Sequence, residues 1–129
     1  MIATSIEQSK KLLELGLSKE SADMLYQCVG FTIHATEGYK DFRYRLRTLE
    51  DAEHKYADEF DVTAWSLSAL LRLLPFPVLW QEMLAGMIGW KCKVTILEDE
   101  TTHTSPLQDT EIDAVLDCIV WLIETNYLC

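Results

Sequence analysis

Hydrophobic positions along the chain change from a helical period to a strand period and back several times. Near the N-terminus, Thr4-Ser5-Ile6-Glu7 has the pattern of a capping box, and Gly16 stands where a left-handed residue ends a helix, which predicts a helix over residues 5–15. Ser18 is placed to cap a second helix. The pattern therefore predicts a helical hairpin over residues 5–27.

From Cys28 onward apolar and polar residues alternate, which is typical of strands with one buried face. Two such runs flank a turn at residues 37–40, so we expect an antiparallel hairpin over residues 28–47. Its second strand carries an outward row of cations: Arg43, Arg45 and Arg47. Residues 50–61 follow as an acidic segment with six acids and one lysine, a composition of solvated surface.

Leucines spaced at i, i+3, i+4 and i+7 predict a buried helix over residues 64–74 that Pro75 stops. A second hairpin is predicted over residues 78–97, whose second strand alternates most regularly. An alternative topology makes residues 78–84 a loop. Residues 101–106 are a loop or a short edge strand, and Thr110 with Asp113 opens a C-terminal helix over residues 110–125.

This order of helices and hairpins, without parallel crossovers, predicts an α+β fold. We expect a small antiparallel sheet of three to four strands with helices packed mainly on one face. The alternative topology leaves three strands. With 129 residues, of which 49% are hydrophobic and 25% charged, the chain suits a single domain over residues 1–129.

The charge is strongly acidic and unevenly distributed. Eleven Lys and Arg face 21 Asp and Glu, a formal net charge of −10 that argues against broad binding to nucleic-acid backbones. The last 36 residues carry eight acids and no Lys or Arg, so −8 of that charge lies there. The cationic row of the first hairpin lies in the nearly neutral part, where an anionic ligand is less disfavoured.

The cysteine spacing and the lack of a targeting signal in the sequence predict a cytoplasmic protein. Cys28, Cys92, Cys118 and Cys129 are far apart and form no Cys-x-x-Cys pair, which excludes a zinc knuckle or thioredoxin-like motif of ordinary spacing. The N-terminus has no secretory leader pattern, and no apolar run approaches the ~20 residues that span a bilayer. We therefore expect no membrane association.

No motif in the sequence specifies a reaction. His34, His54 and His103 share no metal-ligand spacing, and neither a serine nucleophile elbow nor a phosphate-binding loop is present. The acidic segments lack EF-hand spacing. We therefore predict no catalytic residue, no cofactor and no metal. An enzyme would need a pocket that joins one of the histidines to a carboxylate, or a catalytic thiol paired with His103.

Two groups of residues are candidates for interactions. If the two hairpins pair, Lys91 and Lys93 join the arginine row on one face and form a small site for phosphate, nucleic acid or an acidic partner. The alternative is an exposed strand face neutralised by neighbouring acids.

The second group is aromatic. Of four tryptophans, Trp90 and Trp121 fall on core faces, whereas Trp65 begins a helix and Trp80 ends an apolar, proline-containing segment, 76–80. An exposed apolar segment marks a protein interface. Dimerisation through this segment or the adjoining edge strand is the interface hypothesis.

Three blocks of the chain carry a family resemblance. Residues 6–17 (IEQSKKLLELGL) with 20–24 (ESADM), and residues 65–75 (WSLSALLRLLP), resemble a family of small uncharacterised proteins encoded in prophages and mobile elements of gut bacteria. The segment 113–124 is similar to that family's C-terminal helix. The resemblance covers about half the chain and implies an intracellular, phage-related accessory protein. It transfers no catalytic residue, and the segment 76–80 is more apolar than the family pattern.

These observations favour a non-enzymatic interaction protein of a phage or mobile element with a protein partner that the sequence does not identify, because no convergent polar constellation is left over. A second hypothesis is an acidic decoy or immunity-type inhibitor that binds a basic protein by imitating the charge of DNA. A third is an enzyme whose site is assembled by tertiary structure.

Overall fold

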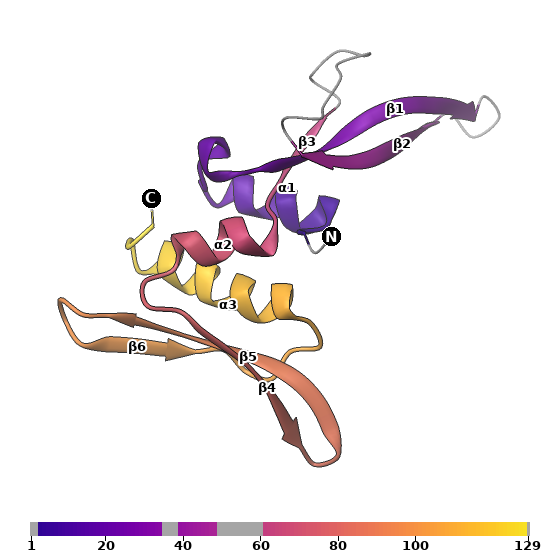
Figure 1. Ribbon diagram of the computed structural model, residues 1–129. Helices are drawn as coiled ribbons and strands as arrows, with labels where there is room; N and C mark the ends of the chain where they lie inside the picture. The colour runs from indigo at the N-terminus through magenta and orange to yellow at the C-terminus, as the bar shows by residue number, and fades with distance from the viewer. Residues whose placement is uncertain (1–2, 35–38, 49–60, 129) are drawn as a thin grey trace.

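A computed structural model describes residues 3–34, 39–48 and 61–128 (Figure 1). These residues contain three α-helices and six strands, with three strands between one α-helix and the next. In chain order they are α1 (Ile6–Glu14), a 3₁₀ turn η1 (Lys19–Ser21), β1 (Met24–His34), β2 (Tyr39–Thr48), β3 (Val62–Ala64), α2 (Leu67–Leu73), β4 (Val78–Leu84), β5 (Met87–Ile96), β6 (Thr101–Thr104) and α3 (Glu111–Glu124).

The fold is α+β, as predicted, but its strands form two antiparallel sheets of three strands instead of one. The first has the order β2-β1-β3, the second β4-β5-β6. The three helices lie between the sheets, so each sheet is covered by helices on its inner face (Figure 1). In each sheet the third strand comes later in the chain than the hairpin: β3 pairs with β1, and β6 pairs with β5.

The helix predicted over residues 18–27 is wrong. Ser18 caps, but it caps only the single turn η1, and Ala22 is already extended. Met24–Tyr26 then pair with β2 on one side and with β3 on the other. Met24 and Leu25 are both buried. Because side chains alternate across a strand, burial on both faces of a central strand outweighs the local helical pattern.

The helix predicted over residues 64–74 begins later, at Leu67. Ala64 belongs to β3, and Ser66 is the N-cap, its Oγ accepting from the Ala69 N–H at 3.1 Å. The Asp23 carboxylate accepts from the Ser66 N–H at 2.8 Å, which fixes this helix start against the beginning of β1.

Other helix ends follow the sequence closely. Ser5 caps α1, with Gln8 rather than Glu7 completing the capping box. Gly16 has φ 99°, and the N–H groups of Gly16 and Leu17 return to the carbonyls of Leu13 and Leu12 as in a Schellman ending. Thr110 caps α3 by accepting from the Asp113 N–H. Within the described residues, no helix combines the length and apolarity needed to cross a lipid bilayer.

The second sheet confirms the predicted hairpin over residues 78–97. Residues 78–84 are a strand, not a loop, and residues 101–104 form the short edge strand β6. The core lies between this sheet and α3: Cys92 and Val94 of β5 are fully buried against Val115, Cys118 and Ile119. Trp90 and Trp121 pack against this core, as predicted.

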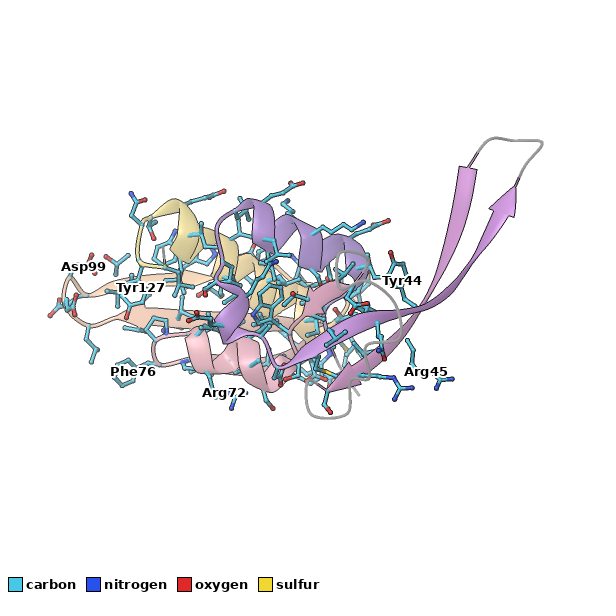
Figure 2. The ribbon with its side chains drawn as sticks, turned by 90° about the horizontal axis from the view of Figure 1, so that it is seen from above. Tyr44, Arg45, Arg72, Phe76, Asp99 and Tyr127 are labelled. Carbon is cyan, nitrogen blue, oxygen red and sulfur yellow. The ribbon has the colours of Figure 1, made fainter. Side chains whose placement is uncertain are left out.

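The β1–β2 hairpin forms an arm. β3 pairs only with Met24–Tyr26, so most of the two-stranded ribbon extends beyond the body of the molecule (Figure 2). Residues 49–60, which include most of the predicted acidic segment and His54, lie outside the described residues.

Candidate functional site

The predicted cationic face is not assembled. Among the described residues no strand pairing joins the two hairpins, which lie in separate sheets on opposite sides of the helices. Arg45 is exposed on β2 (Figure 2), while Lys93 is exposed on β5. Lys91 lies 3.4 Å from the Glu82 carboxylate, across the β4–β5 pair. The five cations therefore do not form one binding face.

The remaining arginines differ in what the structure describes of them. Arg47 is partly buried, and its Nε is enclosed without a hydrogen-bond partner. The side chain of Arg43 lies outside the described part, although its backbone pairs with Gly30. Arg45 is thus the one arginine of this strand whose side chain the structure describes as exposed, and a single exposed cation on a strand is ordinary solvated surface.

The prediction of Trp65 as an interaction residue is wrong. Its side chain is fully buried, and its Nε1 donates to Ser21 Oγ at 2.9 Å. Trp80 remains a surface candidate. It is half-buried on the outer face of the second sheet, where its Nε1 donates to Glu82 Oε2 at 3.0 Å. The same oxygen faces Lys91.

Several exposed apolar side chains lie at the end of the β4–β5 hairpin. We call Met83, Leu84, Met87 and Ile88 the apolar hairpin end; their exposed fractions are 69%, 58%, 64% and 62%. Met83 pairs with Ile88 and Leu84 with Met87, so one pair lies on each face of the ribbon. Apolar surface on both faces of a protruding hairpin is typical of a contact site.

The predicted apolar segment 76–80 adds to this surface. Phe76 is 63% exposed and Val78 53%. Val78 begins β4, the strand whose other end carries Leu84. No other strand in the described ranges pairs with the second side of β4, so β4 is an edge strand of this sheet.

A second site brings together His103 on β6 and the consecutive residues Asp117 and Cys118 on α3. His103 Nε2 lies 2.7 Å from Asp117 Oδ1. The Trp121 ring, one helical turn after Asp117, stacks on the imidazole with centroids 4.8 Å apart and an interplanar angle of 9°. The imidazole is therefore held by contacts at its edge and on its face.

Cys118 lies beneath this pair. Its side chain is fully buried, and its thiol donates to the Cys92 carbonyl at 3.3 Å. A side-chain hydrogen bond with Cys92, followed by burial, raises the pKa of Cys118 far above its usual range. As it stands, the thiol is thus a poor nucleophile, which argues against the catalytic thiol paired with His103.

The space next to this site is a shallow pocket of about 350 Å³ between α1 and α3. Gln8 and Lys11 line it from α1, and Asp113 and Asp117 from α3. Gln8 Nε2 donates to Asp113 Oδ1 at 2.8 Å. His103 is not among the lining residues, so this pocket does not join the histidine and its carboxylate into one concave site.

Sequence spacing could not show this cluster. His103 is 14 residues from Asp117 and lies in a different element. The available signal is the register of β6: His103 pairs with Val94, a buried residue of the face that packs on α3. Strand alternation then directs the imidazole toward the helix.

Comparison of the chain with protein-family models, with curated proteins and with solved structures finds no match.

Proposed function

We propose that this protein is a non-enzymatic protein-interaction domain, an accessory protein of a phage or mobile element, that associates with a second copy of itself through β4. The observation that carries the proposal is the exposed apolar surface of β4, where Val78, Met83 and Leu84 are each more than half exposed. Burying such side chains is worth about 1.5–3 kcal/mol each, so an uncovered cluster favours association.

The residue order of β4 supports a second copy as the partner. The sequence of β4 is nearly symmetric about Gln81. If a second, antiparallel copy of the strand pairs with the first so that the two Gln81 residues are opposite each other, Val78 lies opposite Leu84. The same pairing places Leu79 opposite Met83. Two-fold symmetry makes each of these apolar pairs occur twice, as an isologous interface requires. Trp80 then faces Glu82 of the second copy, so no like charges oppose each other.

The backbone of β4 is also available for pairing. Leu84 and Met87 flank a two-residue turn and therefore form a hydrogen-bonded pair. Glu82, Trp80 and Val78 alternate with this pair and also direct their N–H and C=O groups to β5. The residues between them, Leu79, Gln81 and Met83, direct theirs to the edge of the sheet. An unpaired edge of this kind is a template for another strand.

The test is sedimentation velocity of the full chain over about a hundredfold range of protein concentration, where a dimer increases by mass action. Gln81→Pro removes an outward N–H and leaves the β5 hydrogen bonds intact, and Met83→Lys places a charge in the contact. Leu97→Lys is the matched control, since Leu97 is 61% exposed but lies beyond β5 at the opposite end of the sheet.

We expect the unmodified chain and Leu97→Lys to dimerise alike, and both β4 variants to raise the dimer dissociation constant at least about tenfold, or 1.4 kcal/mol. Circular dichroism melts establish that the variants remain folded. A monomer at every concentration, or a dimer indifferent to both β4 substitutions, contradicts the proposal.

A further inference from the structure

One side-chain cluster is not used by the proposed interface. His103, Asp117 and Cys118 each offer a ligand atom, and these atoms all lie within 4.8 Å of one another. They come from two elements whose relative position is fixed by the packing of α3 on the second sheet. An imidazole nitrogen, a carboxylate oxygen and a sulfur are the three donor types that zinc accepts in proteins.

The donor set discriminates between metals. Mg²⁺ and Ca²⁺ prefer oxygen-only shells, whereas sulfur and imidazole favour Zn²⁺ among the divalent ions that cells supply. The side chains of His103 and Asp117 are 25% and 31% exposed, so an ion can reach them from solvent. Cys118 closes the inner side of the cluster, where it is shielded from water.

Only a small adjustment separates the present geometry from a coordination shell. Bonds of about 2.0–2.3 Å around a tetrahedral zinc place the donor atoms roughly 3.3–3.8 Å apart. The outer limit of 4.8 Å must contract by about 1 Å, and the 2.7 Å contact between His103 and Asp117 must open. The stacked Trp121 ring limits the orientations that the His103 imidazole can adopt.

We propose that His103, Asp117 and Cys118 bind one Zn²⁺ ion, with water in the fourth position on the exposed side. The Cys118 thiol loses its proton to solvent as the Zn–S bond forms, and it gives up its hydrogen bond to the Cys92 carbonyl. The ion takes the place of the direct contact between His103 and Asp117. Three protein ligands and one water form the open type of zinc site.

The test uses Co²⁺ as a spectroscopic probe of the full chain, purified without metal. Cys28→Ser and Cys129→Ser are introduced first, so that only Cys92 and Cys118 retain thiols. We expect one equivalent of Co²⁺ to produce a thiolate charge-transfer band in the near ultraviolet, and Zn²⁺ to abolish it by displacement. Mg²⁺ should leave the band unchanged, because sulfur is a poor ligand for it.

Variants assign the ligands. His103→Gln, Asp117→Asn and Cys118→Ser should each lower the affinity for Co²⁺ at least about 100-fold, since loss of a residue that merely supports a ligand already costs 10–100-fold. Glu124→Gln, an exposed carboxylate near the end of the same helix, is the matched control and should leave the affinity unchanged. Because Cys118 is buried, the two partly exposed ligands keep the test interpretable if Cys118→Ser unfolds.

Zn²⁺ should also raise the melting temperature of the unmodified chain but not that of His103→Gln. Absence of a charge-transfer band at stoichiometric Co²⁺ overturns the proposal. So does a band that survives His103→Gln and Asp117→Asn together. In either case the cluster has only a structural role: His103 and Asp117 form a hydrogen bond between β6 and α3, and Cys118 is a buried core residue. Neither result bears on the β4 interface, which sedimentation tests separately.

Discussion

At the scale of single residues, Thr4 shows how a polar side chain becomes part of the core. It is fully buried, and its Oγ1 accepts from the Trp65 N–H at 3.1 Å. It also shares a 2.7 Å hydrogen bond with Ser9 Oγ. The Thr4 carbonyl accepts from the Tyr26 hydroxyl at 2.8 Å. Thr4 thus connects the start of α1 to Tyr26 of β1 and to Trp65, which lies between β3 and α2.

Replacing Thr4 with valine keeps the shape but removes the hydroxyl. We expect Thr4→Val to lower the free energy of unfolding by about 1–3 kcal/mol, because the buried Trp65 N–H loses that acceptor. Ser9 Oγ also loses its hydrogen bond with Thr4 but still donates to the Ser5 carbonyl. Urea denaturation followed by tryptophan fluorescence measures this change. Thr102→Val, at an exposed position of β6, is the control and should change stability by less than about 0.5 kcal/mol. Equal effects of the two substitutions would refute this role for Thr4.

The sequence assigned Thr4 to a capping box, and that interpretation was partly right. Ser5 does cap α1, which depends on neighbours three residues apart. The burial of Thr4 depends on Trp65, some 60 residues away, so no local pattern contains it.

At the scale of elements, the β4–β5 hairpin depends on a turn of unusual composition. Ala85 and Gly86 both have positive φ, 52° and 81°, as a two-residue type I′ turn requires. Glycine adopts this conformation readily, but alanine is strained in it. The second glycine of this region has a different role. A Cβ at Gly89 would lie 2.7 Å from the Gln108 carbonyl oxygen, so glycine there permits the bridge between Trp90 and Gln108.

Asparagine tolerates the left-handed region better than alanine. We therefore expect Ala85→Asn to raise the free energy of unfolding by about 0.5–1 kcal/mol. Gly86→Ala is the opposite control. Nothing lies within 4 Å of a Cβ at that position, so its expected loss of about 1 kcal/mol comes from backbone conformation alone. Thermal and urea unfolding measure both variants, and a stabilised Gly86→Ala would exclude the type I′ explanation.

Element prediction succeeded where a signal was local and failed where partners were distant. The regular alternation of β5 and the capping signals of α1 and α3 gave correct elements. Residues 24–27 contain a helical apolar pattern, yet they form a central strand, because strands β2 and β3 supply pairing on both sides.

At the scale of the whole molecule, the dominant property is charge. Of the formal net charge of −10, −8 lies in the last 36 residues. These residues fold into the end of β5, β6 and α3, so the acids are concentrated on one part of the structure. Glu98, Asp99 and Glu100 are all exposed at the β5–β6 turn. Repulsion among like charges destabilises a compact state, and salt screens it within about 10 Å at 0.1 M.

Raising the NaCl concentration should therefore increase the melting temperature by several degrees, equivalent to about 1 kcal/mol for a chain of this size. The double variant Glu98→Gln/Glu100→Gln should melt higher at low salt and respond less to NaCl, which differential scanning calorimetry measures. A melting temperature that falls with added salt would show that favourable ion pairs outweigh the repulsion.

The sequence by itself determined most local structure: the helix starts near Ser5 and Thr110, the two hairpins, the acidic C-terminal third and the exposed apolar segment around Val78. Hydrogen bonds between near neighbours and the alternation of side chains suffice for these features. Tertiary structure decided that the hairpins join different sheets, which separates the cations and buries Trp65. It also brings His103 to Asp117 and Cys118. Such juxtapositions depend on the packing of distant segments, whose contacts leave no fixed spacing along the chain.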